Sequence, residues 1–318
     1  MAAAYDLRRQ RRAGIKLTHG RQEQLPAGSP RAELGRPSEF LMLVKTYPVP
    51  SKKYGETVCC AGIDAATGRW VRMYPVNFRS LAEYGQFKKW QFVEASWAVS
   101  ADDSRPESRK IFQDTIRAGR WLSAGKGWTE RRRWIDPLLD QSIESLREEH
   151  LRTGKSLGVI RPKTIKRFIV QPTSPWDTES KDSLMQLSLD WTSSTKPTID
   201  LQILPFDFSY EFECDDSACQ GHRMEVFDWE LGQAYRNFRR QYGPRGWEAA
   251  LRRKYETELP SRDLHFLLGT HHRWGNWLIV GLVAPPHAQV TKRQRRATRQ
   301  LVRQGESMAL PFIGFEAE

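Results

Sequence analysis

Two cysteines and a histidine lie within nine residues of one another in the last third of the chain, with the spacing Cys214-x4-Cys219-x2-His222. Thiolate and imidazole groups are ligands that Zn²⁺ takes in tetrahedral sites. The spacing matches neither a Cys-x2-Cys pair nor a complete finger, so a fourth ligand must come from elsewhere. We expect His271, or its neighbour His272, to complete a structural zinc site.

Ordinary packing of the two cysteines beside a strand end is the alternative. If zinc binds, it should hold the strand 208–213 against the helix 226–242, since metal affinity and folding are coupled where the site exists only in the folded chain. Cys59 and Cys60 are adjacent in an expected strand, so their side chains point to opposite faces and serve packing.

Two pairs of carboxylates are candidates for catalysis. Asp103 and Glu107 lie in the charged loop 102–110, and Asp228 and Glu230 follow His222 closely. Such groups could bind Mg²⁺ or Mn²⁺ in a metal-dependent nuclease or phosphodiesterase. They could equally order nearby arginines or favour a helix dipole, so whether the chain is an enzyme stays open.

Several common catalytic motifs are absent from the sequence. It has no G-x-x-x-x-G-K-[ST] loop, no G-x-G-x-x-G after a strand, no H-E-x-x-H and no G-x-S-x-G. Nucleotide hydrolysis by a P-loop, dinucleotide binding, zincin chemistry and lipase-type catalysis therefore lack support.

Aromatic and basic side chains alternate in ways that suit nucleic acid. On the expected strand 70–76, Trp70, Arg72 and Tyr74 share one face, with Arg79 nearby, which would suit base stacking and phosphate contact. The alternative is that the aromatic side chains are core residues and the arginine reaches out to water.

Further basic residues could hold phosphate groups. These are Arg105, Arg109 and Lys110 in the loop 102–110, and Arg295, Arg296 and Arg299 near the C-terminus.

The net charge is +12 with a pI near 9.7, which favours polyanionic partners. Residues 1–36 hold eight Lys/Arg against three Asp/Glu, and residues 287–318 hold six against three, so the two ends carry most of the excess. A nucleic-acid partner is expected, and the alternative is an acidic protein partner bound through the basic tails. Charge does not decide the oligomeric state.

The composition restricts the location of the protein. Four cysteines in 318 residues do not form a disulfide framework, and no run approaches the ~20 apolar residues that a membrane span needs. The N-terminus has charges where a secretion signal would be apolar. We therefore expect a cytoplasmic protein with no membrane partner.

The hydrophobic pattern predicts an α+β fold. A β-rich N-terminal part, forming a small barrel or a curled sheet, is followed by a mixed α/β C-terminal part that holds the Cys/His metal loop. The expected divisions are a disordered basic arm (1–37), a β-rich part with a helical extension (38–154), a mixed part (155–286) and a basic helical tail (287–318).

The pattern also indicates individual elements. Strands are expected at 40–47, 57–63, 70–76, 93–99, 164–170, 199–204, 208–213, 264–268 and 277–283, and helices from Pro137 to about 153, at 226–242 and at 247–259. Together these features favour a DNA- or RNA-binding protein with a structural zinc site, working in a prokaryotic defence or nucleic-acid-processing system.

Overall fold

A computed structural model of the chain describes residues 37–47, 49–51, 55–78, 81–100, 103–173, 204–271 and 275–287. The expected basic arm, the strand from 199, and the basic tail fall almost wholly outside these ranges. So do five residues singled out from the sequence: Arg79, His272, Arg295, Arg296 and Arg299.

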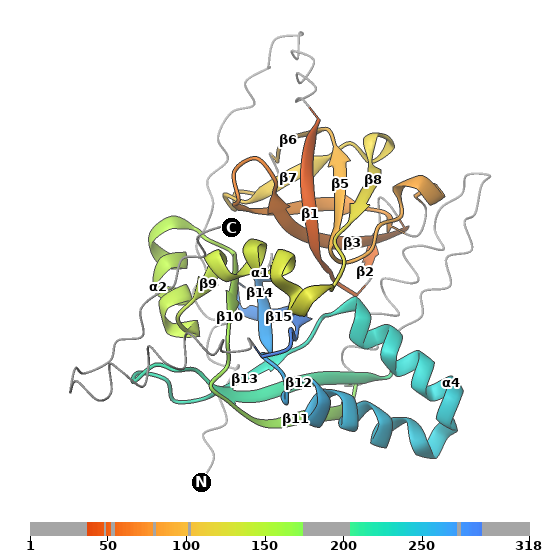
Figure 1. Cartoon of the computed structure of the whole chain (residues 1–318), viewed down its shortest axis with the longest axis vertical. Coiled ribbons are helices and arrows are strands. Elements are labelled where there is room, and N and C mark those ends of the chain that lie inside the picture. The colour runs from red at the N-terminus through yellow and green to blue at the C-terminus, as the bar shows by residue number, and fades with distance from the viewer. Residues whose placement is uncertain are drawn as a thin grey trace, which may run out of the picture. The chain divides into compact units, whose positions relative to one another are not determined.

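The N-terminal part is a strongly curled sheet, as expected (Figure 1). Its strand order is β6-β7-β4-β3-β1-β5-β8, with β2 paired to β3 at the side, and most pairs are antiparallel while β4 and β7 are parallel. The strands are β1 (Ser38–Lys45), β2 (Val49–Ser51), β3 (Gly55–Asp64), β4 (Trp70–Val76), β5 (Gln91–Ala95), β6 (Trp97–Val99), β7 (Ser108–Ile111) and β8 (Arg117–Trp121).

Strand β1 explains why the curled sheet joins the rest of the protein. Its central residues are apolar without alternation, which is typical of a strand buried on both faces. Phe40 and Met42 pack inside the curl, whereas Leu41 and Leu43 pack with Val159 and other residues of the C-terminal part. One hydrophobic core therefore links the two parts.

In the residues that the structure describes, the C-terminal part contains two small sheets and the helices α1, α2 and α4 (Figure 1). The first sheet has the order β15-β14-β10-β9 and the second has the order β11-β12-β13. The strands are β9 (Leu139–Asp140), β10 (Leu157–Ile160), β11 (Thr164–Pro172), β12 (Phe206–Glu213), β13 (His222–Glu225), β14 (His265–Thr270) and β15 (Trp277–Val283). The helices are α1 (Thr129–Ile135), α2 (Ile143–Thr153) and α4 (Trp229–Arg252).

Helix α4 covers most of the region in which the sequence predicts two helices, at 226–242 and at 247–259. Gly243 interrupts it with φ 69° and ψ −171°, directly before Pro244, and a π-helical segment, Arg253–Glu258, continues it. Glycine adopts this positive φ at no steric cost, and proline starts the next turn. No helix in the described part of the chain is long and apolar enough to cross a membrane.

Two other expected elements also differ in the structure. The strand expected at 93–99 is two strands, β5 and β6, separated at Ser96. The helix expected from Pro137 begins at Ile143, because Pro137 lies in a short 3-10 turn and Ser142 instead caps the helix through a hydrogen bond from the Ser145 amide.

Candidate functional site

Cys214, Cys219 and His222 come together, and a glutamate from a distant helix joins them. The ligand atoms of Glu144, Cys214, Cys219 and His222 all lie within 4.8 Å of one another. The His222 Nε2 atom lies 3.0 Å from Glu144 Oε1 and 3.4 Å from Cys219 Sγ. His271 does not belong to this group; it follows β14, where its amide donates to the Asn276 carbonyl.

The N-terminus of α2 positions the Cys/His loop. Ser142, the cap of α2, donates a hydrogen bond of 2.6 Å to Asp216 Oδ2 in the loop, and the Ile143 amide donates to the Cys214 sulfur. Gly221 turns the chain back into β13 with φ 88°. A metal here would hold the β12–β13 hairpin against α2, rather than against the helix 226–242 as expected from the sequence.

The donors suit a soft divalent cation. Burial raises the pKa of the Cys214 thiol to about 12, with Cys219 and Glu144 adding to the increase. Burial also lowers the pKa of His222, which favours the neutral imidazole that metals bind, although Glu144 opposes the shift. Glu144 Oε2 is buried and has no hydrogen-bond partner among the described residues. A cation would satisfy this oxygen and allow the thiols to ionise.

The charged loop after β6 stabilises the fold. Asp103 Oδ2 lies 2.5 Å from Arg105 Nη2 and accepts a hydrogen bond from the Ser108 hydroxyl at 2.7 Å. Arg105 also donates to the Thr270 carbonyl, while the Arg109 guanidinium stacks 4.7 Å from the centre of the Trp97 ring. Asp103, Arg105 and Arg109 therefore have partners among other residues of the protein.

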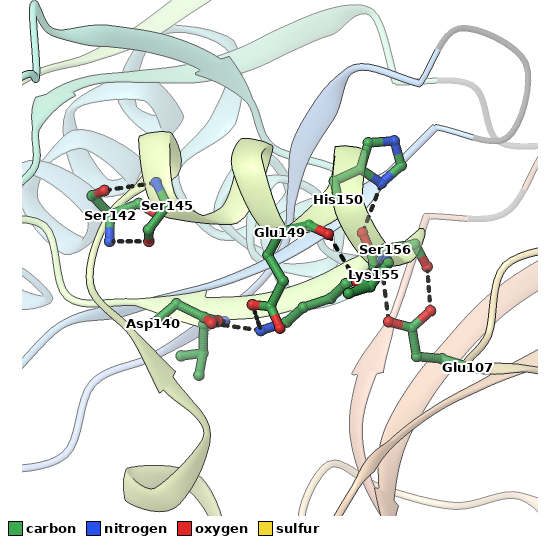
Figure 2. A network of polar contacts seen from close by, with 10 residues as sticks. Glu107, Asp140, Ser142, Ser145, Glu149, His150, Lys155 and Ser156 are labelled. Atoms are coloured by element: carbon green, nitrogen blue, oxygen red, sulfur yellow. Dashed lines mark hydrogen bonds and ion pairs between the residues drawn. The ribbon is translucent and has the colours of Figure 1, made fainter.

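Glu107 and Arg72 both contact Ser156, which directly precedes β10. Figure 2 shows the contact of Glu107 with Ser156. Glu107 accepts hydrogen bonds of 2.9 Å from both the amide and the hydroxyl of Ser156. Arg72 Nη2 donates to the Ser156 carbonyl at 2.9 Å, and Arg72 is only 4% exposed. Both side chains therefore join the curled sheet to the C-terminal part.

The lysine next to Ser156 extends this network. Lys155 Nζ lies 2.6 Å from Asp140 Oδ1 and 2.9 Å from Glu149 Oε2, and its carbonyl contacts the His150 ring (Figure 2). Of the other residues expected on a binding surface, Tyr74 and Lys110 are exposed and paired across β4 and β7, whereas Trp70 is half-buried.

The remaining candidate carboxylates lie at the start of α4. Asp228 caps the helix by accepting from the amides of Glu230 and Leu231, and it also accepts from the Leu282 amide. Asp228 therefore stabilises the start of α4 and its contact with β15. Glu230, by contrast, has a side chain that is 53% exposed, and it lines a cavity.

That cavity was not identified from the sequence. Its volume is about 580 Å³, and we call it the tryptophan pocket. Its lining residues come from both parts of the fold: Lys45, Lys88, Lys89, Trp90, Trp121, Trp128, Arg131, Trp229, Glu230, Gln233, Ala234, Asn237, Lys254 and Leu282. Four indole rings thus stand among five cationic side chains and a single carboxylate.

Arg131 holds three of the rings in place. Its guanidinium lies 5.0 Å, 5.3 Å and 4.5 Å from the ring centres of Trp90, Trp121 and Trp128, and it donates two hydrogen bonds to the Leu122 carbonyl. Burial lowers its pKa, yet arginine stays charged at neutral pH. Arg131 therefore holds these rings in one arrangement through contacts within the protein.

Trp121 is the open face of this cluster. The residue is 50% exposed, although its Nε1 donates a hydrogen bond of 3.1 Å to the Lys89 carbonyl. An exposed indole that is nevertheless fixed is a preformed stacking surface.

Backbone strain coincides with the tryptophan pocket. Trp90 and Trp128 have φ values of 66° and 69°, and they are the two non-glycine residues with positive φ in the described ranges. This conformation is costly for a bulky side chain, by about 1–3 kcal/mol, and such strain tends to gather at functional sites.

A group of paired charges supports the wall of the pocket. Lys89 Nζ lies 3.1 Å from Glu230 Oε2, 3.7 Å from Asp228 Oδ2 and 2.7 Å from the Leu282 carbonyl. Burial opposes the charge on Lys89, but the two carboxylates outweigh it and raise its pKa. Lys45 packs 5.4 Å from the centre of the Trp229 ring, and burial lowers its pKa.

The fold and these sites define an α+β protein with a curled sheet, a Glu/Cys/Cys/His group able to hold a metal ion, and an aromatic, cationic pocket. The chain belongs to a family described as a domain of unknown function (DUF8757), whose model matches residues 139–302. A second domain of unknown function (DUF8758) matches residues 36–137.

Other comparisons add little. No curated protein matches the chain. Among solved structures, the chain is similar to one described as a replication protein A heterotrimer bound to single-stranded DNA, with 11% identity and a TM-score of 0.24 over 86% of this chain and 69% of that one. A likeness this weak does not bear on function.

Proposed function

We propose that this protein binds single-stranded nucleic acid through the tryptophan pocket, and that a zinc ion in the Glu/Cys/Cys/His group stabilises its C-terminal part. The observation that carries the binding proposal is the fixed, half-exposed Trp121 beside five cationic side chains. Aromatic rings stack on unpaired bases whatever the sequence, and cations neutralise the phosphates. The biological setting that we propose is a prokaryotic defence or nucleic-acid-processing system.

Duplex nucleic acid fits this site less well. Paired bases are stacked on their neighbours and cannot present a face to Trp121 without first leaving the helix. The preference should therefore be for single strands, with the basic segments at the two ends of the chain adding affinity that does not depend on sequence.

Fluorescence anisotropy with labelled 20-nucleotide single strands and matched duplexes of DNA and RNA, at fixed salt, tests the proposal. Trp121→Ala should weaken single-strand binding roughly 5- to 150-fold, the equivalent of about 1–3 kcal/mol per stacked base. Tyr84→Ala is the control, because Tyr84 is 59% exposed on the same part of the fold but lies outside the tryptophan pocket.

Three outcomes would count against the proposal. Unchanged affinity in Trp121→Ala would remove the pocket from binding, and equal affinity for polyglutamate would favour an acidic protein partner. Cleavage of the strands on addition of Mg²⁺ or Mn²⁺ would instead identify a nuclease.

Zinc is proposed for the metal group because two thiolates and an imidazole form a soft ligand set. Such a set binds Zn²⁺ in preference to Mg²⁺ or Ca²⁺. All four ligand positions would come from the protein, as in structural sites. Elemental analysis of the purified protein should find one zinc per chain, and clearly less would contradict this assignment.

A further inference from the structure

One wall of the tryptophan pocket is a face of α4 that offers hydrogen-bonding groups in place of aromatic rings. Glu230, Gln233 and Asn237 line the pocket, and their spacing of three and then four residues places them in one row along the helix. This row offers a carboxylate and two amides, which are hydrogen-bonding groups of the kind that read the edges of bases.

We infer that the tryptophan pocket receives one unpaired base, stacked on Trp121, and that Glu230 selects bases with an amino group, namely adenine, cytosine and guanine, over thymine and uracil. This inference rests on the proposed function. It goes further in assigning the number of bases, the edge that is read and the selective residue.

The size of the site supports a single base. A cavity of about 580 Å³ lies within the range of about 300–1,000 Å³ that is usual for small-molecule pockets. Lys88, which is exposed, also lines it and provides a charge for a phosphate of the bound nucleotide. The pocket therefore suits a nucleotide turned inwards from a strand, with the remainder of the strand running outside.

Glu230 is ionised in the folded protein. Burial works against its charge, but Lys89 at 3.1 Å and the neighbouring Lys45 outweigh burial and hold its pKa below the usual value. An ionised carboxylate only accepts hydrogen bonds. It can therefore accept from the N–H of an exocyclic amino group, whereas thymine and uracil offer it a single imino N3–H that lies between two carbonyl oxygens, O4 and O2, which repel the carboxylate.

The amides do not select in this way. Gln233 and Asn237 each offer a donor and an acceptor, so either can adjust to any base by rotating. Selectivity against thymine and uracil therefore depends on Glu230, and removal of its charge should reduce that selectivity.

The test uses strands of abasic linkers that carry a single base at the centre, with the full-length protein. The all-abasic strand should bind weakly, and one adenine, cytosine or guanine should improve affinity at least about tenfold more than one thymine does. Glu230→Gln should reduce this preference to within about threefold, because a glutamine side chain can donate to O4.

Glu248→Gln is the matched control, since Glu248 lies on α4 outside the pocket and should leave the preference intact. If Glu230→Gln does not fold, the wild-type comparison still tests whether the pocket prefers a base with an amino group. Equal binding of all four single-base strands would overturn the inference while leaving single-strand binding intact. Failure of Trp121→Ala to weaken any strand would instead overturn the proposed function.

Discussion

The guanidinium of Arg131 lies 4.5 Å from the centre of the Trp128 ring. Trp128 has a positive φ, and the same guanidinium also contacts Trp121, the last residue of β8. The same group donates hydrogen bonds of 2.9 Å and 2.7 Å to the Leu122 carbonyl. A planar, delocalised cation can stack on indoles and donate in its own plane at the same time. Arg131 therefore fixes the geometry of the tryptophan pocket.

Arg131→Lys should weaken single-strand binding and lower the thermal midpoint. Lysine keeps the charge, but it cannot stack as a plane or donate two hydrogen bonds to one carbonyl, and a buried acceptor with poor partners costs about 1–3 kcal/mol. Arg133→Lys in the same helix is the control, because Arg133 is exposed. Equal melting and binding of the two variants would show that Arg131 does not organise the pocket.

Glu144→Gln should weaken zinc binding more than about tenfold, since even partners outside the ligand shell cost 10- to 100-fold when changed. Competition with a chromophoric chelator measures the affinity, and Glu148→Gln, on the exposed side of α2, is the control.

Cys219→Ser should lower thermal stability and give poorly soluble protein. A folded Cys219→Ser protein with unchanged melting would argue against a structural metal.

The sequence predicted elements best where the apolar run itself defines them. The expected strands at 70–76 and 277–283 coincide with β4 and β15. The run 277–283 is apolar throughout, and the run 70–76 is rich in aromatic and β-branched residues and follows a clear turn. The expected start of α2 was wrong by several residues. Proline at 137 suits the first turn of a helix, but Ser142 and Ser145 form a reciprocal capping box further along, and the helix begins there.

The candidate sites were predicted only as far as their residues are close in sequence. Cys214, Cys219 and His222 were found from their spacing, whereas Glu144 comes from a helix seventy positions earlier and carries no local signal. The tryptophan pocket combines β8, α1 and α4, so the number of tryptophans pointed to large apolar surface but not to its place. Arg72 suited a binding face by alternation, yet the packing of Ser156 against it could not be read from the pattern.

Asp103→Asn should lower stability at neutral pH by about 1–3 kcal/mol, because hydrogen bonds to charged groups are stronger than neutral ones. Although burial opposes its charge, hydrogen bonds from Arg105 and Ser108 hold the pKa of Asp103 well below its usual range. The stabilisation from this depressed pKa is therefore present above the unfolded-state pKa near 4 and is lost as the pH falls through the folded value.

The difference in melting temperature between wild type and Asp103→Asn should accordingly narrow below about pH 4. Asp114→Asn is the control, since Asp114 is exposed on the same part of the fold. A pH-independent difference would show that the contribution of Asp103 does not depend on its ionisation.

Charges at the ends of the chain should affect binding differently from the tryptophan pocket. Residues 1–36 and 287–318 hold fourteen Lys/Arg, and each phosphate contact they make would contribute about 0.7 to the slope of log affinity against log salt on a single strand. The triple change of Arg295, Arg296 and Arg299 to Gln should therefore make the slope shallower. Trp121→Ala should lower affinity at every salt concentration and leave the slope unchanged, because stacking releases no counterions.

The same number of charges removed elsewhere provides the control for this prediction. Arg133, Arg152 and Arg262 are exposed in the described part of the chain, outside the tryptophan pocket, and their triple change to Gln alters net charge equally. If both triple variants make the slope shallower to the same extent, total charge rather than the C-terminal segment governs attraction. If neither does, the cations that contact phosphate lie in the pocket itself, and Lys88→Gln should then reduce the slope by about 0.7.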